Sequence, residues 1–131
     1  MNQLRDVPLI AIVDDEESVR EGTLRLVRSL GFSANAFPSA RAFLNSEKLK
    51  ETSCLLSDIH MPEMSGTELQ DVLRAGGHNI PIVFITAYPD AKIRSQVLAQ
   101  GAICFLEKPV EVERLSRCID EALRKSAGKN D

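Results

Sequence analysis

The chain has 131 residues, of which 44% are hydrophobic and 27% charged, and its formal net charge is −3. This length is enough for one domain with a single buried core, and the composition excludes disordered and fibrous classes. The weakly negative charge argues against direct binding to nucleic acid or to an anionic membrane, because both need a basic surface. No run approaches the roughly 20 apolar residues of a membrane span, so we expect a cytoplasmic protein.

Short apolar runs alternate with helical patterns along the chain. Five runs are predicted as strands, in chain order Leu9–Val13, Phe32–Phe37, Cys54–Ser57, Pro81–Ile85 and Ile103–Leu106. After each run, apolar residues recur three or four positions apart, which is typical of a helix with one buried face. These helical stretches contain Val19–Leu30, Ala42–Leu49, Leu69–Leu73, Ile93–Leu98 and Val110–Lys125.

Strands that alternate with helices predict right-handed crossovers and a parallel sheet covered on both faces. The runs LIAIV, IVFIT and ICFL agree with this prediction, because they are apolar throughout rather than alternating. We therefore expect one α/β domain over residues 1–131, with a core from about 8 to 125 and a polar tail at 126–131.

Four of the five predicted strands end at a residue that can take part in chemistry. The first is followed by Asp14 and Asp15, the third by Asp58 and the fourth by Thr86, and Lys108 follows the fifth. The carboxyl ends of parallel strands lie at one edge of the sheet, where open α/β sheets bind their ligands. These five side chains should therefore meet in one cleft.

The residue types at this edge suit phosphoryl transfer. Three carboxylates in one cleft repel each other unless a cation intervenes, and Mg²⁺ is bound through carboxylates, water and phosphate oxygens. Lys108 adds positive charge and Thr86 a hydroxyl donor, while a carboxylate such as Asp58 can act as the nucleophile. Taken singly, Asp15 could instead charge the first turn of a helix, and Thr86 could be an ordinary strand end.

The three cysteines, Cys54, Cys104 and Cys118, show no metal-ligand spacing. Because Cys54 and Cys104 lie in apolar runs, we expect small buried hydrophobic side chains rather than a redox or zinc site.

The chain resembles the receiver domains of bacterial two-component response regulators from about Leu9 to Leu123. The likeness rests on four segments that occur in this order, IVDDEES, LLSDIHMPEMSG, FITA and FLEKP. Each segment alone is weak evidence, but all four at these spacings are specific. The resemblance implies a doubly wound, flavodoxin-like fold with strand order 2-1-3-4-5 and helices on both faces.

By this resemblance, Asp58 is the phosphoacceptor and Mg²⁺ is the cofactor. Asp15 would bind the ion directly, Asp14 mainly through water, and Asp58 and the backbone carbonyl of His60 would be further ligands. Lys108 would contact the phosphoryl group. The phosphodonor would be a sensor histidine kinase or a phosphotransfer protein, and the domain would catalyse only its own phosphorylation and dephosphorylation.

The resemblance also implies a conformational switch. Thr86 would move toward the phosphoryl group, Phe105 would rotate inward, and the Lys108–Pro109 bond would be cis. The surface formed by the fourth helix, last strand and last helix would then change shape, with homodimerisation as one outcome. Since Phe105 replaces a tyrosine common in the family, only burial of its ring can change.

Three residues would control access to the phosphoryl group. Ala87 is small, as access requires, whereas His60 and Tyr88 are bulky and would flank the path of the attacking water. We therefore expect slower loss of the phosphoryl group than with small or acidic residues at positions 60 and 88. On resemblance alone, the chain is interpreted as part of a larger regulator, such as a transcription factor, rather than as a stand-alone receiver.

Three alternatives compete with this interpretation. A haloacid-dehalogenase-type phosphatase needs two aspartates with one residue between them, whereas Asp14 and Asp15 are adjacent. A flavin-binding module needs a phosphate-binding loop after the first strand, where acids would repel a phosphate. A degenerate receiver that acts only as a protein-interaction scaffold would not need the complete set of acids with Thr86 and Lys108.

Overall fold

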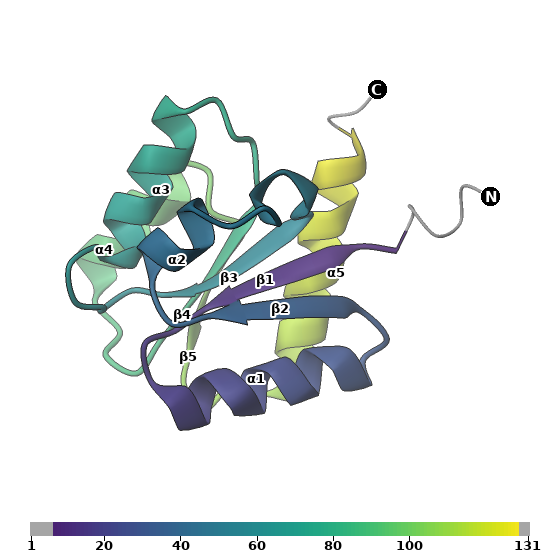
Figure 1. The fold of residues 1–131 in the computed structure, drawn as a ribbon. Helices are drawn as coiled ribbons and strands as arrows, with labels where there is room; N and C mark the ends of the chain where they lie inside the picture. Colours follow the sequence, from purple (N-terminus) through teal and green to yellow (C-terminus); the bar gives the residue numbers. More distant parts are fainter. Residues whose placement is uncertain (1–6, 129–131) are drawn as a thin grey trace.

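The computed structural model describes residues 7–128. Its strands are β1 (Leu9–Val13), β2 (Ser33–Phe37), β3 (Cys54–Asp58), β4 (Ile82–Thr86) and β5 (Cys104–Glu107). They form a parallel sheet in the order β2-β1-β3-β4-β5 (Figure 1). The predicted doubly wound α/β fold and its strand order are therefore confirmed.

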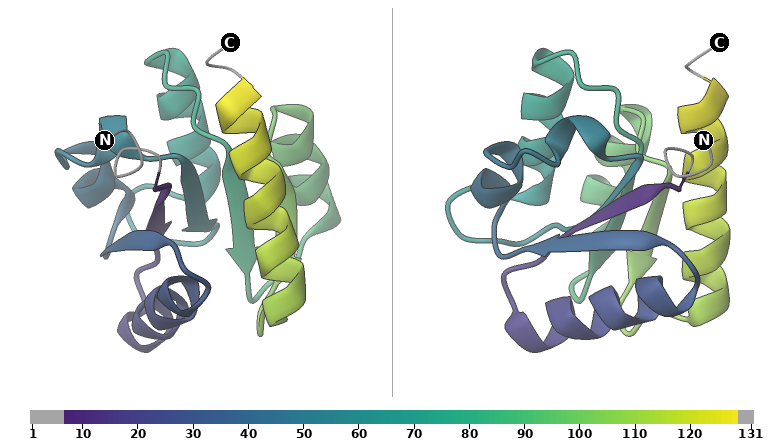
Figure 2. Two further views of the ribbon diagram at one scale, coloured as in Figure 1. Left: turned by 90° about the vertical axis from the view of Figure 1, so that its right-hand side faces the viewer. Right: turned by 45° about the vertical axis from the view of Figure 1, so that its right-hand side comes forward.

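Helices cover both faces of this sheet. They are α1 (Glu17–Ser29), α2 (Ala40–Leu44), α3 (Gly66–Ala75), α4 (Ala91–Ala99) and α5 (Val112–Gly128), with a 3₁₀ helix, η2 (Leu49–Glu51). Figure 2 shows α1 and α5 on one side of the sheet and α2, α3 and α4 on the other.

Two hydrophobic clusters explain why the strands are apolar throughout. In β1, Ile10 and Ile12 pack with Val27 of α1, whereas the alternating residues Ala11 and Val13 pack on the opposite face. Successive side chains of a strand point to opposite faces, so a strand covered on both sides needs an apolar residue at every position. Each large aliphatic side chain buried in this way contributes about 1.5–3 kcal/mol.

The second and last helices differ from the prediction. The helix α2 ends at Leu44, and Leu49 lies in the separate η2, because the Ser46 hydroxyl accepts a hydrogen bond from the Lys48 N–H and stabilises a turn. The helix α5 continues to Gly128, so the first half of the predicted polar tail is helical. Residues 129–131 of that tail lie outside the described residues.

The cysteines also differ from the prediction. Cys104 in β5 and Cys118 in α5 form a disulfide bond, whereas Cys54 is a free, fully buried cysteine in β3. Burial raises the pKa of the Cys54 thiol to about 12, so this side chain behaves as the small hydrophobic group that was predicted.

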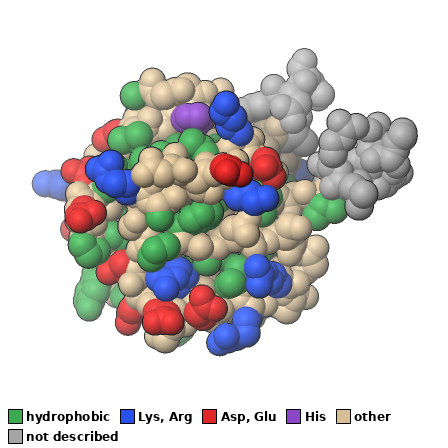
Figure 3. Space-filling view, in the orientation of Figure 1, with side chains coloured by type: hydrophobic (Ala, Val, Ile, Leu, Met, Phe, Trp, Pro, Cys, Tyr) green, Lys and Arg blue, Asp and Glu red, His purple; other side chains and the backbone are tan. Residues whose placement is uncertain are grey.

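One face of the molecule carries side chains of both charges. Lys and Arg side chains are interspersed with Asp and Glu side chains over the face shown in Figure 3. Within residues 7–128, no helix combines the length and apolarity required to span a bilayer.

One glycine is required by the close packing of α3 on the end of β3. A Cβ atom on Gly66 would collide with the backbone carbonyl oxygen of Asp58 and lie 3.1 Å from the Cα of Ile59. The Gly66 N–H donates a hydrogen bond of 2.7 Å to the Ile59 carbonyl, which fixes the helix against this strand end. Gly66 thus positions the loop that follows Asp58, a role that its loop position in the sequence did not reveal.

This contact predicts opposite effects for two glycine substitutions. Gly66→Ala should destabilise the fold by about 1–3 kcal/mol, because backbone atoms cannot move aside as a flexible side chain can. Gly22→Ala in α1 is the matched control, since nothing lies within 4 Å of a Cβ atom there. It should gain up to about 1 kcal/mol from helix propensity. Urea unfolding of both variants measures this, and equal effects of the two substitutions would contradict the packing argument.

Candidate functional site

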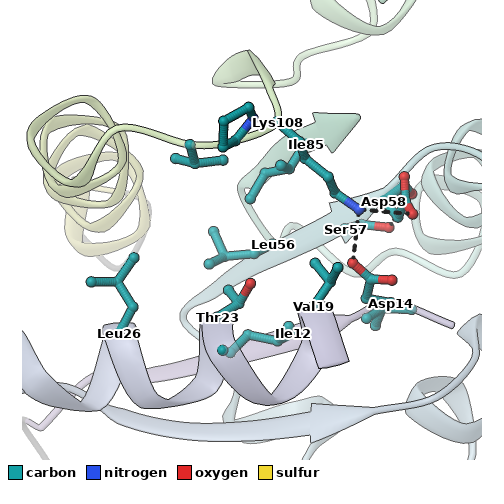
Figure 4. A pocket seen from close by; sticks show the side chains of 14 residues that line it. Ile12, Asp14, Val19, Thr23, Leu26, Leu56, Ser57, Asp58, Ile85 and Lys108 are labelled. Carbon is teal, nitrogen blue, oxygen red and sulfur yellow. Dashed lines mark hydrogen bonds and ion pairs between the residues drawn. The ribbon is translucent and has the colours of Figure 1, made fainter. Parts of the chain in front are cut away.

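The predicted polar residues meet at the carboxyl ends of β1 and β3, where the strand order reverses. Asp14 follows β1, Asp58 is the last residue of β3, and Lys108 follows β5. Figure 4 shows the Lys108 side chain extending toward both carboxylates. This edge of the sheet is where α/β folds of this topology place their ligand sites.

Lys108 bridges the two acids. Its Nζ atom lies 3.1 Å from Oδ2 of Asp14 and 3.3 Å from Oδ2 of Asp58. The side chains are 15% exposed for Lys108, 8% for Asp14 and 10% for Asp58. Charge-assisted hydrogen bonds between groups so shielded from water are stronger than surface ion pairs.

Backbone groups orient the two carboxylates further. The Ile59 N–H donates to Oδ1 of Asp58 at 2.7 Å, and the Glu16 N–H donates to Oδ1 of Asp14 at 2.9 Å. Arg20, from the second turn of α1, donates to the Asp14 carbonyl oxygen at 2.9 Å. Sequence reasoning missed Arg20; its only signal was a basic residue six positions after Asp14, on the helix that follows β1.

Three carboxylates converge at this edge. One oxygen each from Asp14, Asp15 and Asp58 lies within 4.8 Å of the others, and Asp15 is exposed whereas Asp14 is buried. Carboxylate oxygens are the ligands preferred by a hard dication such as Mg²⁺. The donor set therefore fits this ion, with Asp15 on the solvent side.

Electrostatic effects shift the pKa values of two of these groups. Burial raises the pKa of Asp58 and repulsion from Asp14 adds to this, while Lys108 and the Ile59 N–H oppose it. For Lys108, burial lowers the pKa, but the hydrogen bond to Asp14 and the attraction of both carboxylates outweigh it, so the pKa is raised. The metal-free site thus favours a charged lysine and resists full ionisation of Asp58.

These shifts predict how stability changes with pH in metal-free protein. The pKa of Asp58 is higher in the folded state than in the unfolded state. The wild-type protein therefore loses stability relative to Asp58→Asn as pH rises from the unfolded-state pKa to the folded-state pKa. The two proteins should be equally stable below about pH 3. At neutral pH Asp58→Asn should be neutral or more stable by up to about 2 kcal/mol.

Urea unfolding in chelator across this pH range measures the difference. Asp71→Asn is the matched control, since Asp71 is exposed on α3. A large loss of stability in Asp58→Asn at neutral pH would show instead that the Asp58 carboxylate has a structural role.

Thr86 and the residues after it form the next part of the site. Thr86 is completely buried, and its hydroxyl oxygen accepts a hydrogen bond of 3.0 Å from the Tyr88 N–H. In the sheet, Asp58 is paired with Ile85, so Thr86 lies one residue farther along β4. Ala87 and Tyr88 are exposed.

The two bulky residues at this end of the sheet lie together. The rings of His60 and Tyr88 have centroids 6.0 Å apart and meet edge to face, and Tyr88 is 73% exposed. Their side chains come from the loops that follow β3 and β4, two strands that are neighbours in the sheet.

Phe105 and the Lys108–Pro109 bond occupy the far edge of the sheet. Phe105 is paired with Phe84 of β4 and is partly buried on the side covered by α4. The peptide bond between Lys108 and Pro109 is cis. Phe105 thus starts from an intermediate exposure from which its ring could become more buried.

A pocket of about 440 Å³ opens beside Lys108 and Asp58. Its walls are mostly apolar. They come from α1, from the carboxyl ends of β1, β3 and β4, and from the start of the β5–α5 connection. Figure 4 shows the apolar side chains of Leu26 and Leu56 away from the carboxylates of Asp14 and Asp58. A partner that reaches Asp58 from this side would meet an apolar surface.

The sequence model of the response regulator receiver domain family matches residues 10–120 of this chain. This chain belongs to the response regulator receiver family. The receiver is 40% identical to the response regulator protein TodT of Pseudomonas putida over 116 residues, which cover 88% of this chain and 51% of TodT. It is 33% identical to the transcriptional regulatory protein FixJ of Bradyrhizobium diazoefficiens over 117 residues, or 89% of this chain and 57% of FixJ.

Solved structures give the same assignment. The receiver superposes on the crystal structure of FixJ-N with a TM-score of 0.80 and 34% identity, covering 89% of this chain and 94% of that one. It superposes on the low-resolution structure of the response regulator StyR with a TM-score of 0.87 and 42% identity, covering 94% and 62% of the two chains. These comparisons give no support to the phosphatase or scaffold alternatives.

The receiver spans about half the length of the curated relatives it matches. The chain is thus a regulatory domain of the two-component kind.

Proposed function

We propose that Asp58 of this receiver accepts a phosphoryl group from a sensor histidine kinase or a phosphotransfer protein. The observation that carries the proposal is the placement of Lys108, whose Nζ lies within 3.3 Å of Asp58 in a cluster of three carboxylates. A cation next to a nucleophilic carboxylate is the arrangement that phosphoryl transfer requires, because the reaction depends on positioning and charge neutralisation.

In the proposed reaction, an Asp58 carboxylate oxygen attacks phosphorus, and the donor nitrogen leaves with the bonding electron pair. The Ile59 N–H holds Oδ1 of Asp58 and so limits rotation of the carboxylate. Lys108 compensates the negative charge that gathers on the phosphoryl oxygens. Asp14, Asp15, Asp58 and the His60 backbone carbonyl would hold Mg²⁺, which when bound supplies further charge neutralisation for transfer and for hydrolysis.

The same proposal includes a two-state switch. Thr86 would exchange its hydrogen bond with the Tyr88 N–H for one with the phosphoryl group. The vacated space would let Phe105 turn inward, and the surface formed by α4, β5 and α5 would change shape. Support comes from the position of Thr86 at the end of β4 and from the partial burial of Phe105 on the α4 side.

The output of the switch is proposed to be protein association, including a phosphorylation-dependent homodimer. Because the matched relatives are about twice as long and several are named transcriptional regulators, we further propose that the receiver belongs to a larger transcriptional regulator. The receiver itself, with its mixed surface charge, would not contact DNA.

Incubation with Mg²⁺ and a small acyl-phosphate donor, followed by intact mass measurement, tests the proposed phosphoryl transfer. Wild type should gain one phosphoryl group, whereas Asp58→Asn and a chelated sample should gain none. A phosphoryl adduct on Asp58→Asn would contradict the assignment of the acceptor.

The paired rings of His60 and Tyr88 predict slower loss of the phosphoryl group than small or acidic residues at these positions would allow. They would obstruct the water that hydrolyses the acyl phosphate, so Tyr88→Glu and His60→Asn should each speed its decay severalfold. Decay is followed by intact mass after removal of the donor. Unchanged lifetimes in both variants would exclude this role for the rings.

A further inference from the structure

The disulfide lies within the proposed output surface. Cys104 is the first residue of β5 and directly precedes Phe105, while Cys118 lies in the second turn of α5. The Cα atoms are 6.2 Å apart, within the usual range for a disulfide, so the backbone holds both residues at bonding distance. The bond therefore ties the strand that carries Phe105 to the helix beside it.

A groove of about 590 Å³ gives access to this bond. It runs along β5 between α4 and α5, and both cysteines line it; Cys118 is 8% exposed and Cys104 is partly exposed. Its charged residues are Arg94, Arg114, Arg117, Arg124, Asp120 and Glu121. Four cations against two anions make the groove electropositive, which favours the approach of an anionic thiol or disulfide.

We propose that Cys104 and Cys118 form a reversible thiol–disulfide exchange site, whose partner is an anionic low-molecular-weight disulfide of the glutathione type. One thiolate attacks the external disulfide and forms a mixed disulfide while one small thiol leaves. The second cysteine then attacks the mixed disulfide, the internal bond forms and the second small thiol leaves. Two electrons and two protons pass from the cysteine pair to the external disulfide, and reduction reverses each step.

Cys54 shows what distinguishes the exchange pair. It is fully buried in β3, its pKa is raised by burial, and it lies away from the groove. Reactivity of cysteines follows exposure and positive surroundings, so Cys54 should stay reduced under all conditions that oxidise the pair. Cys54 therefore serves as an internal unreactive control for the Cys104–Cys118 pair.

The bond should oppose the switch, and this part rests on the proposed function. A covalent tie between β5 and α5 stabilises the arrangement seen in this structure relative to one in which the two elements shift. Linkage is reciprocal, so phosphorylation of Asp58 should make the disulfide easier to reduce by the same factor. We expect the equilibrium constant for forming the bond to fall about fivefold or more on phosphorylation, the lower end of typical coupling.

Titration of the wild-type protein with mixtures of glutathione and glutathione disulfide tests reversible exchange. Intact mass and thiol labelling should show a smooth change between a dithiol form and a form lighter by two hydrogens, with Cys54 unlabelled until unfolding. Cys104→Ser and Cys118→Ser should each lose the transition. Persistence of the bond in fully reduced glutathione would mean a permanent bridge. Dithiols or mixed disulfides at every ratio of glutathione to glutathione disulfide would mean no exchange site. Either result overturns the proposal.

Repeating the titration with phosphodonor and Mg²⁺ tests the coupling. The wild-type equilibrium constant should shift while that of Asp58→Asn should not. The same constant for phosphorylated and unphosphorylated protein would overturn the coupling. Absence of any phosphoryl adduct would count against the proposed function instead, and the titration without donor would still decide whether the pair exchanges.

Discussion

Replacement of Lys108 by alanine should slow phosphorylation of Asp58 by about 10²–10³-fold, the loss expected when one preorganised donor to a charged transition state is removed. The Nζ atom lies 3.1 Å from Asp14 and 3.3 Å from Asp58, in surroundings that exclude most water. The ammonium group of Lys108 therefore already lies where negative charge develops during phosphoryl transfer to Asp58. Water that entered in its place would stabilise that charge less. The folded state should also become less stable without metal, because both carboxylates lose their cation.

Single-turnover phosphorylation by a small acyl phosphate, followed by intact mass, measures the rate. Lys92→Ala is the matched control, since it removes the same charge from an exposed position on α4. Lys108→Arg keeps the charge but not the compact ammonium geometry and should recover only part of the rate. A rate within a factor of two of wild type in Lys108→Ala would remove Lys108 from the proposed mechanism.

Removal of divalent cation should have the second large effect. Without metal, phosphorylation should fall below detection, and Mg²⁺ at a hundred times its dissociation constant should raise the free energy of unfolding by about 2.7 kcal/mol. The physical reason is the convergence of three carboxylate oxygens within 4.8 Å, whose mutual repulsion a dication relieves.

Asp15→Asn separates metal binding from the folding of the site, because Asp15 is exposed and Lys108 bonds to the other two acids. This variant should fold normally and lose most of the stabilisation by Mg²⁺, whereas Glu21→Gln in α1, which removes one exposed negative charge, should retain it. Thermal melts of each variant with Mg²⁺ and with chelator measure this stabilisation. Equal stabilisation of wild type and Asp15→Asn would show that Asp15 is not a ligand.

Most of the site could be located from sequence because the topology gathers strand ends. Once parallel strands were predicted, Asp14, Asp58 and Lys108 had to lie at one edge, whatever the details of packing. The sequence could not show that Lys108 bridges both acids, because that depends on side-chain directions set by the β5–α5 connection. Nor could it show the hydrogen bonds from Arg20 and the Ile59 N–H, which depend on how the backbone leaves β1 and β3.

The disulfide escaped prediction for a different reason. Spacing alone does not determine cysteine connectivity, and the apolar runs around Cys54 and Cys104 look alike in sequence. Only the three-dimensional structure separates them, since Cys104 at the start of β5 lies within bonding distance of Cys118 and Cys54 in β3 remains a free cysteine. The ends of α2 and α5 were misplaced because local capping and turn hydrogen bonds, rather than hydrophobic periodicity, decide where a helix stops.

The position of the phosphoryl group in the chain decides whether Asp58 is the acceptor. Borohydride reduction of the phosphorylated receiver converts an aspartyl phosphate into homoserine, which peptide mass mapping then locates in the chain. We predict a single conversion, at Asp58, that requires both Mg²⁺ and phosphodonor. Conversion at Asp14 or Asp15, or phosphorylated protein with no converted aspartate, would contradict the assignment of Asp58 as the acceptor.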